Sequence, residues 1–239
     1  MRTPIATNSM VLGRILARHA RYRPHHTAVI FGDLRLTYAD FNAYVNRWAN
    51  ALTALGIGRG GRVATVLPNS LELLATYWSC AKLGTAAVPL SPLLLADGLT
   101  SLLGDARPGV VITSAALRPV VEAAVGRLTY RPAPIRILID AASSGFEASG
   151  ELLAAASETE PDTGVEADDL ATIMYTSGTT GLPKGIMHTH FIRSMYAGLL
   201  ASTWEMNARS KVLHTGAIIF NGALVTMLPA FHVGATYIL

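Results

Sequence analysis

One segment of the sequence is rich in groups that can bind an anion. Residues 175–185 read Tyr-Thr-Ser-Gly-Thr-Thr-Gly-Leu-Pro-Lys-Gly. The side chains that can donate hydrogen bonds or positive charge to a ligand are Thr176, Ser177, Thr179, Thr180 and Lys184. The glycines leave backbone N–H groups open to a ligand, and Pro183 restricts the backbone next to the lysine. This composition favours a polyphosphate ligand, with a plain Ser/Gly/Thr turn as the alternative.

Two other phosphate-binding signatures do not fit this sequence. In the Walker A spacing counted from Gly178, Pro183 stands where a glycine is required and Gly185 stands where Ser or Thr is required. Residues 56–61 satisfy G-x-G-x-x-G, but they follow a predicted helix and precede a predicted strand, which is the reverse of a dinucleotide site. We interpret them as a helix stop and turn.

Short apolar runs alternate with helical patterns along the chain. The runs predict strands over residues 28–31, 63–67, 86–90, 110–113, 136–139, 170–175 and 235–239. Helices are predicted over residues 38–55, 70–82, 95–103, 115–126, 151–156 and 191–205. The first begins after Thr37, with Asp40 as its capping partner. Because the strand runs are continuously apolar, we predict an α/β fold with mostly parallel sheets flanked by helices.

Composition narrows the class of protein. The 239 residues are 51% hydrophobic and 15% charged, which excludes a disordered or coiled-coil chain. The net charge is +3 and the basic residues are scattered, so we expect no nucleic-acid partner. Cys80 is the single cysteine, which excludes a disulfide framework and favours a reducing compartment. Since residues 1–25 do not read as a signal peptide, we expect a cytoplasmic protein.

Residues 212–239 carry no formal charge and are the one candidate for a membrane span. Histidine, glycine, asparagine and proline interrupt this stretch, whereas a spanning helix needs about 20 predominantly apolar residues. We therefore predict a buried strand, helix and strand here, and no transmembrane segment.

Residues 176–185 match, position for position, the phosphate-loop motif of the AMP-forming acyl-CoA synthetases. The chain resembles this adenylate-forming family, which also contains luciferases and the adenylation domains of peptide synthetases. Similar sequence occurs at residues 36–38, 62–63, 68–70, 82–84, 87–89, 228–230 and 234–236. The resemblance covers nearly the whole chain, and it implies the N-terminal domain of an acyl-CoA synthetase.

The resemblance implies a reaction in two steps. A carboxylate attacks the α-phosphorus of MgATP to give an acyl-adenylate and pyrophosphate, and a thiol, usually coenzyme A, then displaces AMP to give a thioester. The residues that would hold the β- and γ-phosphates are Thr176, Ser177, Gly178, Thr179, Thr180, Gly181 and Lys184. Their work would be positioning and charge stabilisation, and no catalytic residue is assigned within this chain.

The sequence departs from the family beside the acyl site. Where family members have an aromatic-His segment, residues 216–222 read Gly-Ala-Ile-Ile-Phe-Asn-Gly, and the histidine is absent. His214 precedes this segment, and we interpret it as a core or edge residue. We expect a fatty or other apolar acid, in a pocket lined by Ile218, Ile219, Phe220, Asn221 and Gly222.

His188 and His190 form a histidine pair that could be proposed as a metal site. No Cys, Asp or Glu lies close to them in sequence, and His190 matches a histidine often found in the family at the helix start after the loop. We therefore expect no metal site built by the protein, and Mg²⁺ would enter with ATP.

The family is longer than this chain. Its adenine and ribose segments, interdomain hinge and C-terminal domain with a catalytic lysine have no counterpart in residues 1–239. We expect a truncated N-terminal domain with weak or no ligase activity alone. A first α/β subdomain is placed at residues 1–165, and the start of a second, with the phosphate loop 175–185, at residues 166–239.

Three alternatives stay open at this point. The same family fold could pass an aryl or amino acid to a carrier protein. The chain could be a non-catalytic module that binds nucleotide or a partner chain, or an unrelated α/β scaffold with an incidental loop. A homodimer is also kept open.

Overall fold

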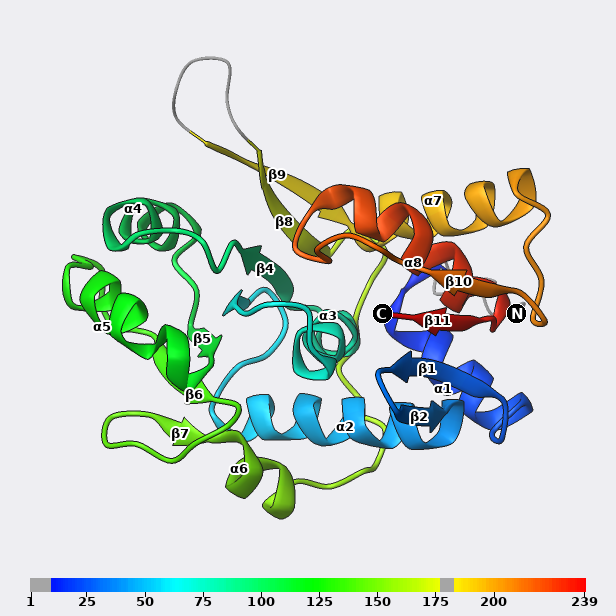
Figure 1. The fold of residues 1–239 in the computed structure, drawn as a ribbon, viewed down its shortest axis with the longest axis horizontal. Helices are drawn as coiled ribbons and strands as arrows, with labels where there is room; N and C mark the ends of the chain where they lie inside the picture. The colour runs from blue at the N-terminus through cyan, green and yellow to red at the C-terminus, as the bar shows by residue number, and fades with distance from the viewer. Residues whose placement is uncertain (1–9, 177–182) are drawn as a thin grey trace, which may run out of the picture.

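The computed structural model of the protein describes residues 10–176 and 183–239. A larger and a smaller β-sheet are flanked by helices (Figure 1). In the larger sheet the strand order is β7-β6-β5-β3-β4-β8-β9, and neighbours are parallel except β8 and β9. Its strands are β3 (Arg62–Val66), β4 (Ala86–Leu90), β5 (Val110–Thr113), β6 (Ile135–Leu138), β7 (Glu147–Ala148), β8 (Leu170–Thr176) and β9 (Lys184–Thr189).

The smaller sheet has the order β10-β11-β1-β2. Strand β1 is antiparallel to β2 and parallel to β11, which is parallel to β10. These strands are β1 (Thr27–Phe31), β2 (Leu34–Thr37), β10 (Lys211–Leu213) and β11 (Thr236–Ile238). The predicted α/β fold with mostly parallel sheets is confirmed.

Helices cover both faces of the larger sheet. They are α1 (Gly13–Tyr22), α2 (Tyr38–Ala54), α3 (Leu71–Leu83), α4 (Ala96–Ala106), α5 (Arg118–Gly126), α6 (Ser149–Ala155), α7 (His190–Thr203) and α8 (Asn221–Val233), with a 3₁₀ turn at Ala115–Leu117. α4 and α5 pack on one face, where Val66, Val88, Leu103 and Val121 share an apolar cluster. α2 and α3 pack on the other face, in a cluster that also contains residues of α1 and α8.

Helix α3 is enclosed on all sides. Every residue from Leu73 to Leu83 is buried, which explains why its sequence is apolar around the helix rather than along one stripe. The Trp78 ring of α3 lies 4.8 Å from that of Phe231 in α8, which lies 5.8 Å from that of Tyr237 in β11. α3 therefore connects the cores of the two sheets.

The ends of α2 and α3 follow from side-chain and glycine signals. The Thr37 hydroxyl accepts a bond from the Asp40 N–H, and the Asp40 carboxylate accepts one from the Thr37 N–H, which completes the expected capping box. The Ser70 hydroxyl caps α3 by accepting from the Leu73 N–H. Gly84 ends α3 at φ +66°, a conformation that favours glycine, and turns the chain into β4.

Strand β9 was not predicted from the sequence. The helix predicted over residues 191–205 is confirmed as α7, which begins at His190, but the residues before it form a strand antiparallel to β8. Most β9 side chains are exposed or half-buried, including the apolar Ile186 and Met187, so the strand lacks a buried apolar run. Helix α1 and the strands β2 and β7 were likewise missed, and each of these two strands is four residues or shorter.

The sheets do not divide the chain at residue 165. β8 and β9 extend the sheet that begins with β3, and β10 and β11 join β1 and β2. Both sheets therefore draw strands from residues 1–165 and from residues 166–239, and the two subdomains stay a prediction.

Residues 212–239 fold as the predicted strand, helix and strand, in β10, α8 and β11, but β10 is exposed or half-buried rather than buried. Within the described ranges, no helix has the length and apolar character needed to cross a bilayer.

Two buried histidines should make the stability depend on pH. Burial is the main cause that lowers the pKa of His19 and of His190 from 6.5 to about 4. In the unfolded chain the two imidazoles take up protons as the pH falls below 6.5, whereas in the folded chain they stay neutral down to about pH 4. The free energy of unfolding should therefore fall with pH in this window, by up to about 1.4 kcal/mol per pH unit for each histidine.

Urea unfolding between pH 7 and pH 4 measures this slope. His190→Gln should reduce it, whereas the matched change at the exposed His25, His25→Gln, should leave it as in the wild type. Equal slopes in all three proteins would contradict the assignment.

Candidate functional site

The candidate site lies at the edge of the larger sheet where β4 and β8 end. These strands are parallel and pair at Ala87 and Thr172, so their carboxyl ends face the same edge, where ligands bind in α/β folds. Beyond Thr172, β8 pairs only with β9, in the registers Tyr175–Gly185 and Thr176–Lys184. This two-stranded ribbon projects from the sheet at the top of Figure 1.

Thr176 and Lys184 are the two predicted phosphate ligands that the structure places. They are cross-strand partners at the end of the ribbon, and both are exposed. Lys184 forms no ion pair with a carboxylate of the described residues, so its ammonium group is open to a ligand. The other predicted ligands lie outside the described residues, and they are Ser177, Gly178, Thr179, Thr180 and Gly181.

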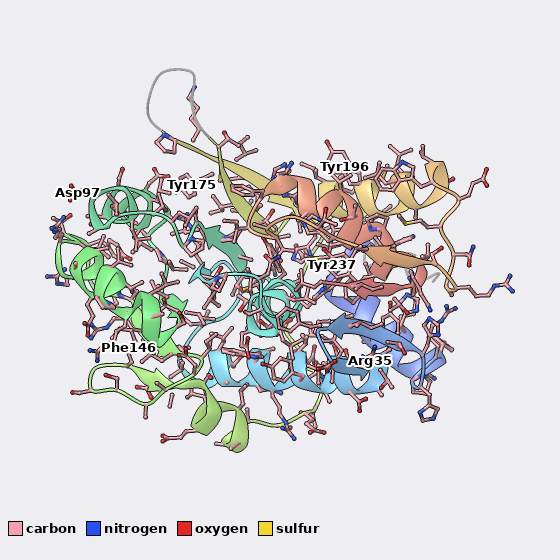
Figure 2. All side chains as sticks on the ribbon, viewed as in Figure 1. Arg35, Asp97, Phe146, Tyr175, Tyr196 and Tyr237 are labelled. Atoms are coloured by element: carbon pink, nitrogen blue, oxygen red, sulfur yellow. The ribbon has the colours of Figure 1, made fainter. Side chains whose placement is uncertain are left out.

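A groove with a volume of about 220 Å³ lies beside the end of the ribbon. Its walls come from the end of β4 and the loop after it, from α4, from the ribbon and from the segment before α8. The lining residues are Pro89, Leu90, Ser91, Leu94, Leu102, Tyr175, Thr176, Pro183, Ile219 and Phe220. Figure 2 labels Tyr175 on the ribbon, near α4. The groove thus joins the base of the phosphate loop to the segment predicted for the acyl pocket.

The five residues predicted to line the acyl pocket lie in different environments. Ile219 and Phe220 line the groove, and Phe220 is 59% exposed. Ile218 is fully buried and is not part of the groove lining. Asn221 and Gly222 are the exposed first residues of α8. A pocket role for Ile218, Asn221 and Gly222 stays a prediction.

Asn69 and Tyr77 fix the backbone of the segment before α8. The Ile218 N–H donates to Asn69 Oδ1 at 2.8 Å, and Asn69 Nδ2 donates to the Gly216 carbonyl at 2.7 Å. The Tyr77 hydroxyl donates to the Ile218 carbonyl at 2.7 Å. Both carbonyls and the N–H are satisfied by side chains from elsewhere in the chain, and this holds Ile219 and Phe220 at the groove.

Five residues at or beside the groove were not predicted as site residues, namely Asn69, Leu90, Ser91, Leu94 and Tyr175. The sequence did contain a signal for two of them, because Asn69 follows the predicted strand 63–67 and Ser91 follows the predicted strand 86–90. Residues after parallel strands gather at one edge of a sheet. The missing information was the strand order, which places β4 between β3 and β8.

The histidines make structural contacts. His190 is buried, and its Nδ1 accepts a bond from the Leu12 N–H at 3.3 Å, while His188 Nδ1 lies 3.2 Å from Arg193 Nη2. His214 Nδ1 lies 3.2 Å from the Thr226 hydroxyl of α8. Among residues 10–176 and 183–239, no three His, Cys, Asp or Glu side chains converge as a metal site would require.

The bonds of Asn69 predict a loss of stability on truncation. Asn69→Ala removes the partners of the Ile218 N–H and the Gly216 carbonyl, and should lower the free energy of unfolding by about 1–2 kcal/mol. Asn69→Asp keeps the acceptor for Ile218 and should cost less. Asn50→Ala is the control, because Asn50 bonds two carbonyls of an exposed loop that water can reach. Urea unfolding that gives equal losses for Asn69→Ala and Asn50→Ala would refute the role of Asn69.

The sequence and fold are similar to those of known AMP-binding enzymes. Residues 16–239 match the family described as AMP-binding enzyme. The chain is 37% identical over 229 residues to the long-chain-fatty-acid–CoA ligase FadD13 of Mycobacterium tuberculosis, covering 95% of this chain and 44% of that protein. It is 36% identical over 238 residues to a feruloyl-CoA synthase of Amycolatopsis sp, covering 94% of this chain and 45% of that protein.

A solved structure supports the same relationship. The inhibitor-bound crystal structure of the N-terminal domain of FACL13 from Mycobacterium tuberculosis matches with a TM-score of 0.81 at 35% identity, covering 95% of this chain and 56% of that chain. The chain spans less than half the length of the two curated relatives named above. By sequence and by fold, it belongs to the family of AMP-binding enzymes.

Proposed function

We propose that this chain provides the phosphate loop and part of the acyl site of an AMP-forming carboxylate–CoA ligase. The reaction would join a carboxylic acid to the α-phosphate of MgATP with release of pyrophosphate, and would then transfer the acyl group to coenzyme A. The observation that carries the proposal is the groove, because it places the base of the phosphate loop against Ile219 and Phe220. The family membership and the ligase relatives support it.

The phosphate end of the site would act through charge and hydrogen bonding. Thr176 and Lys184 stand side by side on the ribbon, so a hydroxyl donor and an ammonium group can reach one polyphosphate. We propose that Ser177, Gly178, Thr179, Thr180 and Gly181 complete the cradle. The ammonium group of Lys184 would stabilise the negative charge that develops on the leaving pyrophosphate.

The acyl end of the site favours an apolar acid. Leu90, Leu94, Ile219 and Phe220 give the groove an apolar wall, which would attract a hydrocarbon chain rather than a charged one. A fatty acid is the substrate that we propose, in agreement with the named substrate of the relative at 37% identity. An aryl acid is the second candidate, because the exposed Phe220 ring can stack on an aromatic substrate and a feruloyl-CoA synthase is also a relative.

We propose that residues 1–239 alone have weak or no ligase activity. Large apolar side chains are exposed on β9 and α7, among them Met187, Met195, Tyr196 and Leu199. Large exposed apolar side chains, where they gather in a patch, often mark a surface that further protein covers. The proposal agrees with the coverage of the relatives, in which more than half of the protein has no counterpart in this chain.

Calorimetry with MgATP and with inorganic tripolyphosphate tests the phosphate site in the chain as it stands. Lys184→Ala removes a charged hydrogen-bond donor and should raise the dissociation constant for both ligands by roughly 10-fold or more. The control is Lys211→Ala, which removes an exposed lysine from β10. No binding by the wild type, or equal affinities of the two variants, would count against the proposed function.

A further inference from the structure

The outer part of the β8–β9 ribbon has little support from the larger sheet. β8 pairs with β4 only at Thr172, and from Ile173 to Thr176 its strand partner is β9 alone. A two-stranded ribbon is marginally stable without further packing. Its direction must therefore be set by side chains that reach another element.

Tyr175 makes that connection to helix α4. Its hydroxyl donates to Asp105 Oδ2 at 2.5 Å and lies 3.5 Å from the Leu102 carbonyl. Among the described residues of the outer ribbon, 173–176 and 183–187, these are the side-chain hydrogen bonds to another element. The ring packs against the apolar cluster beneath α4 and α5, and Figure 2 shows the labelled residue on this side of the ribbon. Burial, followed by the bond to Asp105, raises the pKa of Tyr175, so the hydroxyl remains a donor at neutral pH.

Gly185 gives the Tyr175 ring its position on the ribbon. The two residues are cross-strand partners, and a Cβ atom at Gly185 would lie 3.2 Å from the tyrosine ring and 3.0 Å from Ile173 Cγ2. The ring therefore lies close against the backbone of β9, so the contact with α4 holds both strands of the ribbon.

Asp105 stands where a carboxylate is otherwise unfavourable. It lies in the last turn of α4, near the negative end of the helix dipole, and it forms no ion pair with a described residue. The bond from Tyr175 gives this exposed carboxylate a donor, and a charged acceptor makes that bond stronger than a neutral one.

We propose that Asp105 and Tyr175 form a clamp that fixes the ribbon on α4 and thereby positions Thr176 and Lys184 for a polyphosphate. Asp105 is a positioning residue in this account, because it acts on the ligand only through Tyr175. The inference rests on the proposed function of the loop.

Variants of Asp105 distinguish the effect of its hydrogen bond with Tyr175 on ligand binding from the effect of its negative charge. Asp105→Ala and Asp105→Asn remove the same negative charge, but asparagine keeps an oxygen that accepts from Tyr175. By calorimetry, Asp105→Ala should bind tripolyphosphate roughly threefold to tenfold more weakly than Asp105→Asn. Tyr175→Phe should weaken binding by a similar factor, and combining it with Asp105→Ala should add little. Tyr130→Phe, which removes a hydroxyl bonded to the Pro108 carbonyl, is the control and should bind as the wild type does.

Amide hydrogen exchange tests the clamp without any ligand. Residues 184–187 should exchange faster in Asp105→Ala and Tyr175→Phe than in the wild type, and Asp105→Asn should restore the slower exchange. Equal affinities and equal exchange rates for Asp105→Ala and Asp105→Asn would overturn the inference. If the wild type binds no tripolyphosphate, the proposed function fails, while the exchange rates still decide whether the clamp exists.

Discussion

The parallel pairing of β8 with β4 is the constraint on which the site depends. It directs the carboxyl end of β8 to the same edge as the end of β4, and the Thr172–Ala87 register determines where the ribbon leaves the sheet. The enclosed helix α3 supports this arrangement, because its apolar residues pack against the larger sheet and Trp78 contacts Phe231, which in turn contacts Tyr237 of the smaller sheet. A shift of β8 by one residue would turn Tyr175 away from α4 and remove Thr176 from the groove.

The groove combines two chemistries in a small space. The ribbon end presents a hydroxyl and an ammonium group, while the walls beside it are leucine, isoleucine and phenylalanine side chains. Under the proposed function, an acid with an apolar body and a polyphosphate would be held next to each other, as acyl-adenylate formation requires. Asn69 and Tyr77 hold Ile219 and Phe220 in place, because their side chains form hydrogen bonds with the backbone just before these two residues.

Much of this could be predicted from the sequence, and the misses have physical causes. The strands of the larger sheet with apolar runs were predicted because they are covered on both faces, and the ends of α2 were predicted because Thr37, Asp40 and Gly56 are local signals. β9 was missed because its side chains are exposed, so no burial pattern marks it. Leu90 and Leu94 were missed as site residues because the order of strands depends on long-range packing.

A crystal structure of the protein soaked with a non-hydrolysable ATP analogue tests the central claim most directly. The account predicts the β- and γ-phosphates at the end of the ribbon, with a phosphate oxygen within hydrogen-bond distance of both the Thr176 hydroxyl and Lys184 Nζ. A triphosphate bound at another place in the fold, with Thr176 and Lys184 free of it, would contradict the account.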